Sequence, residues 1–374
     1  MLSRALLLIL ALLGGTPSLA LAVYESLYVL GDSLSDNGNA FILSGGVFPP
    51  NPPYAERFSN GPATAELLAA QLGVPSVPSA LGGTNYAVGG ATTGTENFSF
   101  EVQPGVPAAL DNTGMLVQLG SFLGSGPSVD PATSLFMVWG GPNDFFLAFE
   151  RGDDLVSTIG TAVNNIATVV FTLAELGVTD ILVPNMPNLA VTPFGQAQTP
   201  EAQAALAAIS AAFNTLLSQA LADLQLATMI NLMEFDIARL LQDVIDDPAA
   251  FGFDNVTGQC LAFADPGSVP GCEGFLFFDG VHPATFTHQL VADRLFARVT
   301  AASVPEPSNL ALTVLALLAA TMASSAAPRR RRERDAAIGP FAESSRGRAP
   351  PPRRAARGPM KRPAALFGAA KPAG

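Results

Sequence analysis

Short apolar runs of strand type alternate along the chain with longer segments of helical periodicity. The strand-like runs are residues 27–30, 135–139 and 180–183, with a shorter one at 229–232. The helical patterns cover residues 64–72, 154–176, 200–225 and 283–300. Strands that alternate with helices indicate a parallel sheet covered on both faces, so we predict a single α/β domain over residues 23–303.

Both ends of the chain depart from this pattern. Residues 1–22 have the order of a secretory signal peptide, with a positive start at Arg4, an apolar segment and the small-residue cleavage site Ala20-Leu21-Ala22. At the other end, an uncharged segment at about residues 309–327 precedes four arginines at 329–332. As a helix it would be about 28 Å long, close to the thickness of a bilayer core. We expect a membrane-spanning helix with the arginines on the cytoplasmic side; a buried apolar helix is the alternative.

Charge is unevenly distributed along the chain. Residues 23–303 contain 27 Asp and Glu but five Lys and Arg, a net charge of −22, against −12 for the whole chain. A domain with so large a negative charge repels nucleic acid and anionic lipid, which argues against both as extended partners. It leaves hydrolysis of single lipid molecules open. Residues 333–374 are instead rich in Ala, Pro and Arg, and we expect a disordered tail.

The two cysteines, Cys260 and Cys272, lie in a loop rich in Gly, Pro and Asp. In an exported protein such a close pair favours a disulfide, which would hold the loop that precedes Asp279. A Cys/His zinc cluster would need both cysteines and both histidines of the chain. We therefore expect no metal site, and no cofactor.

A polar turn, Gly31-Asp32-Ser33, ends the first strand-like run. The carboxyl edge of a parallel sheet is where α/β folds bind ligands, so this turn can present the Ser33 hydroxyl there. A serine hydroxyl becomes a nucleophile when a neighbouring base takes its proton. The alternative is an ordinary polar turn, because Gly, Asp and Ser are common turn residues.

Later segments supply candidate partners for Ser33. Asp279 precedes His282 by three residues over a glycine turn, so one short loop can hold a carboxylate and an imidazole. Asn143 follows the second strand and can donate a hydrogen bond to an oxyanion. The glycine-rich turn around Gly90 lets the backbone approach a ligand closely. The alternatives are a loop salt bridge for the first pair and helix capping for Asn143 and Asp144.

One histidine and one proline-rich segment add to this picture. His288 lies one and a half turns into the last predicted helix, and we interpret it as structural. Residues 41–60 are rich in proline and aromatic residues. This segment is too irregular for secondary structure and too apolar for a solvated linker, so we expect it to fold over the sheet edge near Ser33 and shape a cleft. Residues 94–114 show no clear pattern.

The order of these motifs resembles the SGNH hydrolase family, also called GDSL lipases and esterases. The motifs that carry the resemblance are Gly31-Asp32-Ser33-Leu34, Gly90, Gly140-Gly141-Pro142-Asn143-Asp144 and Asp279-Gly280-Val281-His282-Pro283. Residues 57–62, 85–91 and 182–193 are similar to its larger secreted esterases and phospholipase-like members. The resemblance implies a flavodoxin-like three-layer α/β/α sandwich with a mainly parallel sheet. Residues 63–65 depart from it, since relatives often carry a tryptophan there; this affects the shape of the cleft.

The same resemblance implies a role for each site residue. Ser33 is the nucleophile, His282 the general base and Asp279 the acid that orients it. The oxyanion hole comprises the backbone amides of Ser33 and Gly90 and the side chain of Asn143. We therefore expect an exported serine esterase or lipase that forms an acyl-enzyme with a small-molecule, lipid or polysaccharide ester. The alternatives are an acyltransferase with the same triad and a non-catalytic polysaccharide-binding surface protein.

Residues 304–332 resemble the PEP-CTERM sorting signal of Gram-negative bacteria that make extracellular polysaccharide. The three parts occur in order: Val304-Pro305-Glu306-Pro307-Ser308, the apolar segment and the arginines. The resemblance implies processing by an exosortase, membrane anchoring through the C-terminal helix before processing, and a place in the cell envelope or extracellular matrix. The chain departs from such signals by continuing for about forty residues after the arginines.

Overall fold

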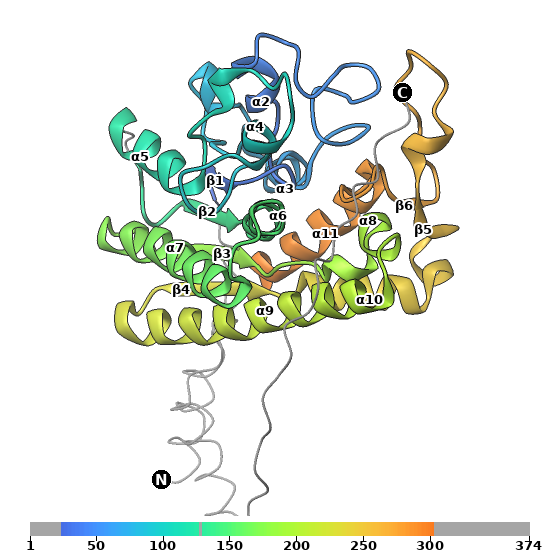
Figure 1. Cartoon of the computed structure of the whole chain (residues 1–374). Coiled ribbons are helices and arrows are strands. Elements are labelled where there is room, and N and C mark those ends of the chain that lie inside the picture. The colour runs from blue at the N-terminus through green and yellow to red at the C-terminus, as the bar shows by residue number, and fades with distance from the viewer. Residues whose placement is uncertain (1–23, 127–128, 303–374) are drawn as a thin grey trace, which may run out of the picture. The chain divides into compact units, whose positions relative to one another are not determined.

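A parallel sheet forms the centre of the computed structural model, which describes residues 24–126 and 129–302 (Figure 1). Its strands are β1 (Ser26–Gly31), β2 (Ser134–Trp139), β3 (Asp180–Pro184) and β4 (Asn231–Phe235), paired in that order. The first three coincide with predicted runs. The fourth begins and ends later than residues 229–232, because Met229 has a left-handed backbone (φ 59°) that ends the preceding helix.

An irregular segment extends the sheet beyond β1. The N–H of Val29 donates to the carbonyl of Thr84 (3.1 Å), and the N–H of Tyr86 donates to the carbonyl of Val29 (2.8 Å). Asn85 therefore lies parallel to β1 as a short additional strand. This segment is the second strand in sequence and lies at the edge of the sheet, next to β1. The order across the sheet is therefore 2-1-3-4-5 when strands are numbered by sequence, which is the flavodoxin-like order. The predicted α/β fold is confirmed.

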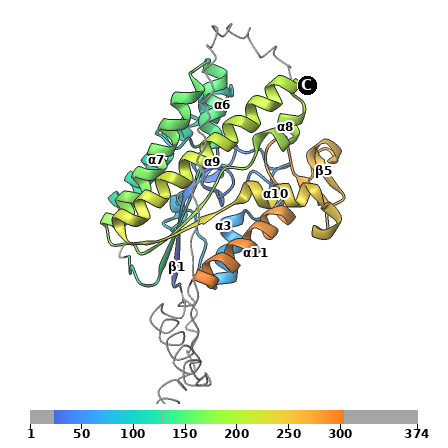
Figure 2. The same cartoon turned by 90° about the horizontal axis from the view of Figure 1, so that it is seen from below.

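Helices cover both faces of the sheet (Figure 2). One face carries α3 (Thr64–Leu72), α10 (Ile237–Asp246) and α11 (Thr285–Ala302); the other carries α5 (Met115–Ser125), α7 (Leu155–Glu175) and α9 (Pro200–Thr228). Successive strand residues point to opposite faces. In β1, Leu27 and Val29 pack in the first of these layers, whereas Tyr28 and Leu30 pack in the second. Because both faces are buried, the strands read as continuous apolar runs.

Helices α7 and α9 are long and apolar enough to cross a membrane by length and composition. In the structure, however, they pack on the sheet. Ile166 and Val170 of α7 and Phe213 and Leu217 of α9 are buried in one cluster with Phe136 of β2. Their apolar character is explained by this core.

The remaining α-helices and strands complete the domain. They are α2 (Asn39–Leu43), α4 (Phe98–Val102), α6 (Pro142–Arg151), α8 (Pro193–Gln196), β5 (Asn255–Gln259) and β6 (Phe275–Phe277). Strands β5 and β6 pair with each other and are separate from the main sheet. The predicted signal peptide (1–22), sorting signal (304–332) with its helix at about 309–327, and tail (333–374) lie outside the described residues.

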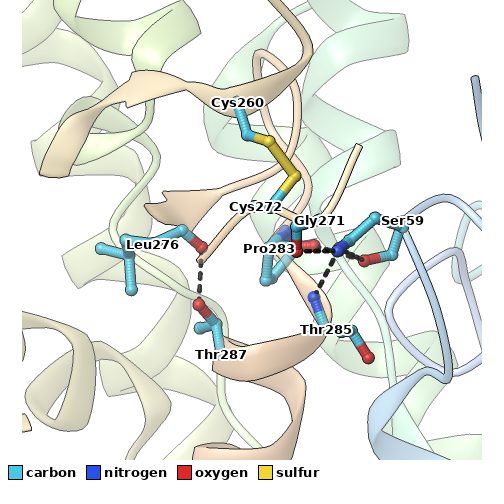
Figure 3. The surroundings of a disulfide bond; sticks show 9 residues. Ser59, Cys260, Gly271, Cys272, Leu276, Pro283, Thr285 and Thr287 are labelled. Carbon is cyan, nitrogen blue, oxygen red and sulfur yellow. Dashed lines mark hydrogen bonds between the residues drawn. A yellow bond between two sulfur atoms is a disulfide. The ribbon is translucent and has the colours of Figure 1, made fainter. Parts of the chain in front are cut away.

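The predicted disulfide between Cys260 and Cys272 is confirmed (Figure 3). Both cysteines are buried beside Phe278, the residue before Asp279. The neighbouring backbone is held from two directions: Ser59 Oγ donates to the carbonyl of Pro283 (2.9 Å), and Thr287 Oγ1 donates to the carbonyl of Leu276 (2.6 Å). The disulfide therefore belongs to the scaffold of the loop that carries Asp279.

Candidate active site

Ser33 lies in a tight turn that begins where β1 ends. Gly31 allows this turn, because a Cβ there would come within 2.5 Å of the carbonyl oxygen of Trp139. The side chain of Gln118 accepts from the Gly31 N–H and donates to its carbonyl, both at 2.8 Å. Asp32 Oδ1 accepts the N–H of Leu34 (3.0 Å). The backbone around Ser33 is thus held from both sides.

Asp279 and His282 share one short loop between β6 and α11. Asp279 Oδ1 accepts the backbone N–H groups of Val281 (2.9 Å) and His282 (2.8 Å). Asp279 Oδ2 lies 2.7 Å from Nδ1 of the His282 ring, and Nε2 of that ring lies 2.8 Å from Ser33 Oγ. With its Nδ1 proton donated to the carboxylate, the neutral ring has Nε2 as an acceptor toward the hydroxyl. The structure brings together the three residues predicted as a triad.

The negative charge of Asp279 and the positive charge of protonated His282 stabilise each other. Burial alone would lower the pKa of His282, but the charge of Asp279 and its hydrogen bond outweigh burial and raise that pKa above 6.5. Burial conversely favours neutral Asp279, yet His282 and the backbone donors hold the pKa of Asp279 below 3.8. The carboxylate therefore stays ionised and favours protonation of the ring.

Asn143 lies in the first turn of α6. Its Nδ2 donates to the carbonyl of Ala91 (3.0 Å), so the side chain reaches toward the Gly90 turn. The capping alternative is not supported, because the residue at the N-cap of α6 is Gly141, with no side-chain cap bond. Asp144 instead accepts from the N–H (2.9 Å) and Oγ1 (2.6 Å) of Thr93.

Gly90 has a backbone that favours glycine. Its φ is +83°, and a Cβ would lie 2.4 Å from Asn97 Oδ1. Within residues 24–126 and 129–302, neither the Gly90 N–H nor the Ser33 N–H donates a hydrogen bond to a protein acceptor. Both amides predicted for the oxyanion hole are therefore without a protein acceptor in the described part of the chain.

Asp36 connects the Ser33 turn to the Gly90 turn, and the sequence analysis did not identify it. Its carboxylate accepts the N–H of Gly89 at 2.8 Å and those of three residues that follow it in the chain: Gly38, Asn39 and Ala40. Its position three residues after Ser33 in a polar turn is the signal that could have indicated it. Gly89 is far from Asp36 in the sequence, so the contact between these two residues leaves no such signal.

The proline-rich segment at residues 41–60 reaches the site, as expected. The prediction that it has no secondary structure is wrong for its first three residues, which end α2. The ring of Phe58 lies 5.3 Å from the ring of His282, centroid to centroid. The hydroxyl of Tyr54 donates to Asp279 Oδ2 (2.9 Å). The sequence analysis did not identify Tyr54, because its partner lies 225 positions further along the chain.

Three half-buried phenylalanines form a row that we call the aromatic row: Phe98, Phe146 and Phe194. Phe146 contacts both neighbours, with ring centroids 5.7 Å apart in each pair. Each of these phenylalanines is attached to a segment that carries a predicted site residue. The N–H of Phe98 donates to the carbonyl of Gly90 (2.7 Å), and that of Phe194 donates to the carbonyl of Gly280 (2.8 Å). Phe146 lies one turn after Asn143 on α6.

His288 is buried in α11, in keeping with a structural role. Its Nδ1 accepts the N–H of Thr64 (3.2 Å) and lies 2.8 Å from Thr64 Oγ1. Burial, with a smaller effect from His282, lowers the pKa of His288 to about 3. Among the described residues, no group of three or more His, Cys, Asp or Glu side chains could hold a metal ion.

Comparisons with known proteins identify relatives over most of the chain. The chain is similar to Thermolabile hemolysin of Vibrio parahaemolyticus, with 28% identity over 71% of this chain and 62% of the relative. It is also similar to Phosphatidylcholine-sterol acyltransferase of Aeromonas hydrophila, with 26% identity over 72% of this chain and 88% of the relative. Esterase EstA of Pseudomonas aeruginosa is 28% identical over 78% of this chain, which spans 49% of that relative.

The chain therefore spans less than two thirds of the hemolysin and about half of the esterase. The model of one family, described as GDSL-like Lipase/Acylhydrolase, matches residues 27–295, which include every residue predicted for the site. The chain belongs to the GDSL-like lipase/acylhydrolase family, a family of ester-bond hydrolases.

Proposed function

We propose that the protein is a serine esterase that hydrolyses carboxylic esters through an acyl-enzyme on Ser33. The observation that carries this proposal is the unbroken hydrogen-bond chain from Ser33 Oγ through the His282 ring to Asp279, with steps of 2.8 and 2.7 Å. A loop salt bridge alone would not require a serine hydroxyl at the free nitrogen of the ring. That hydroxyl is the feature that favours a nucleophile.

In the proposed reaction, His282 Nε2 takes the Ser33 proton as Oγ attacks the ester carbonyl carbon. The tetrahedral oxyanion is stabilised by the N–H groups of Ser33 and Gly90 and by Asn143 Nδ2. The imidazolium then gives its proton to the leaving alcohol, and an ester of Ser33 remains. Water repeats the sequence, so the products are a carboxylic acid and an alcohol. Asp279 stays ionised throughout and stabilises the imidazolium.

The aromatic row favours an apolar acyl group. Its three rings continue from the Gly90 side of the site, through the helix that carries Asn143, to the loop of Asp279 and His282. A row of partly exposed rings attached to these segments gains free energy when an alkyl chain covers it. We therefore propose fatty acyl esters, including single lipid molecules, over acetyl esters of sugars.

An acyltransferase is the second candidate. It is favoured by the similarity to the Aeromonas hydrophila acyltransferase, 88% of which this chain covers. The triad would form the same acyl-enzyme, and an alcohol would replace water in the second half of the reaction. Product analysis with and without added alcohols distinguishes the two candidates. The third alternative, a non-catalytic polysaccharide-binding protein, does not account for the bond between Ser33 and His282.

We also propose that the enzyme is exported by the segment at residues 1–22 and sorted to the envelope or matrix of a Gram-negative bacterium by the signal at 304–332. The Cys260–Cys272 disulfide supports this location, since structural disulfides persist in oxidising compartments. Processing by an exosortase would release the body from its anchor at residues 309–327. Mass spectrometry of the cell-surface form tests this: a chain that keeps residues 309–327 would contradict processing.

A serine-directed fluorophosphonate probe tests the enzymatic proposal directly. We expect the full chain to be labelled at Ser33, and Ser33→Ala to lose both labelling and hydrolysis of p-nitrophenyl esters. The matched control is Ser35→Ala, since the Ser35 hydroxyl has no hydrogen-bond partner in the described structure. It should keep labelling and activity. Hydrolysis retained by purified Ser33→Ala would contradict the assignment.

A further inference from the structure

Asp279 is buried and receives four hydrogen bonds. Three come from its own loop: two backbone N–H groups donate to Oδ1, and the His282 ring donates to Oδ2. The fourth comes from Tyr54, whose hydroxyl lies 2.9 Å from Oδ2. Tyr54 precedes Asp279 by 225 positions. Among the described residues it is the one donor to this carboxylate from outside the loop, and it shares its acceptor oxygen with the His282 ring.

The direction of the Tyr54 bond follows from its surroundings. Burial, and then the negative charge of Asp279, raise the pKa of Tyr54 above its usual 10. The phenol therefore keeps its proton and donates it to the ionised carboxylate. Edge-on contacts with Phe278 (5.0 Å) and Phe58 (6.3 Å) hold the ring in place.

We propose that Tyr54 is a positioning residue of the acid–base pair, an inference that rests on the proposed role of His282 as the base. Its hydroxyl fixes Asp279 Oδ2 at the distance that the imidazole needs. By occupying the same oxygen, the hydroxyl also limits the negative charge that this carboxylate presents to His282. Tyr54 acts through Asp279 and does not itself touch the ester.

Removing this hydroxyl deletes none of the other groups that act on His282. Ser33 lies at Nε2, and the carboxylate of Asp32 acts on the ring from the turn after β1. From α11, the buried His288 lies close enough for its pKa to respond to His282. Since Tyr54→Phe removes one hydroxyl and retains the aromatic ring, its effect reports on one hydrogen bond.

The two histidines of the chain make a direct measurement possible. In the full chain with isotope-labelled histidine, NMR follows the imidazole signals of both rings as pH varies. His288, with its pKa lowered to about 3, does not titrate near neutral pH, so the ring that does is His282. With one donor to Oδ2 removed, the carboxylate stabilises the imidazolium more strongly. We expect Tyr54→Phe to raise the pKa of His282 by about half a pH unit or more.

Kinetics gives a second readout. The acidic limb of kcat/KM should move to higher pH by the same amount, and kcat at its optimum should fall roughly tenfold, because the carboxylate is held less firmly. The control is Tyr86→Phe, which removes another buried phenol hydroxyl, bonded to Ser125 Oγ at 3.1 Å and away from the triad. This control should leave both readouts unchanged.

An unchanged or lowered pKa of His282 in Tyr54→Phe overturns the inference, as does an equal shift in Tyr86→Phe. The NMR titration needs no ester, so it separates this inference from the proposed function. If the unaltered chain hydrolyses no ester and reacts with no fluorophosphonate, the proposed function fails. The Tyr54 inference is still decided by the titration.

Discussion

His282 Nε2 lies 2.8 Å from the hydroxyl oxygen of Ser33, although 249 positions separate the two residues. The fold makes this contact by bringing the turn after β1 and the loop after β6 to one edge of the sandwich. Because Asp279 holds the opposite nitrogen of the ring at 2.7 Å, the imidazole has one free position, and Ser33 occupies it. The pH dependence of the enzyme should therefore follow the protonation of this ring.

We expect kcat/KM for a p-nitrophenyl ester to fall as pH decreases, with a midpoint above 6.5. The charge of Asp279 outweighs the effect of burial and raises the pKa of His282, and the protonated ring cannot accept the Ser33 proton. Initial rates between pH 5 and pH 9, on enzyme whose fold is checked by circular dichroism at each pH, measure the midpoint. A flat profile, or a midpoint well below 6.5, would contradict the role of His282 as base.

Asn143→Ala should reduce kcat by roughly a hundredfold or more, because one oxyanion donor is lost. Its bond to the carbonyl of Ala91 is also lost, so KM for the same ester should be measured to detect displacement of the Gly90 turn. Asn164→Ala, at an exposed position of α7, is the matched control and should behave as the unaltered enzyme. A kcat within threefold of the control would remove Asn143 from the proposed oxyanion hole.

Phe146→Ala should change the preference for acyl chain length. Without the middle ring of the aromatic row, an alkyl chain loses apolar contact, so kcat/KM for octanoate and longer esters should fall roughly tenfold or more. Acetate does not reach along the row, and its value should stay within about threefold. The control, Phe171→Ala, removes a ring on α7 that is 46% exposed. Equal losses for acetate and octanoate would show that the row does not bind the acyl chain.

Asp32→Asn should alter the pH dependence of stability. Asp32 Oδ2 is buried without a hydrogen-bond partner, and burial raises the pKa of this carboxyl from 3.8 to about 7. The stability contributed by its protonated form is complete below pH 3.8 and is lost as pH rises through 7. Asparagine never ionises, so the variant should become more stable relative to the unaltered chain between pH 5 and pH 8.

Urea unfolding of both chains at these two pH values measures that difference. Comparing two chains at the same pH cancels the contribution of His288, which acts with the opposite sign. Asp144 raises the pKa of Asp32 and Asp32 raises that of His282, so these two couplings belong to the measured difference. Asp153→Asn, at an exposed site, controls for the loss of one charge. A stability difference that does not change between pH 5 and pH 8 would show that Asp32 is ionised at both.

The sequence predicted those parts of the fold that local patterns determine. The helix at residues 64–72 agrees with α3 at both ends, because apolar spacing and a following glycine define it. Helix α5 was not predicted, since Gly120 and Gly124 interrupt its pattern and glycine weakens a helix. Residues 94–114, which showed no pattern, contain α4, a helix too short for periodicity to indicate.

For the site, the sequence predicted the residues that chemistry requires but not those that hold them. Ser33, Asp279 and His282 stand out because their residue types and spacing suit one reaction. Gln118, which holds the backbone of Gly31, is 87 positions from it and looks like any polar residue of a helix. Such contacts depend on tertiary packing, and one sequence without its fold carries no signal for them.

The separation of 249 positions between the proposed nucleophile Ser33 and its proposed base His282 has a consequence for biosynthesis. At translation rates of about 5–20 residues per second, the Ser33 segment exists for roughly 10–50 s before His282 is made. Throughout that interval the serine has no partner to activate it. On the same assignment, we expect a prematurely terminated chain that ends before the acid–base loop to be inactive. On the proposed assignment, the chain must therefore be complete through His282 before Ser33 can attack its first ester.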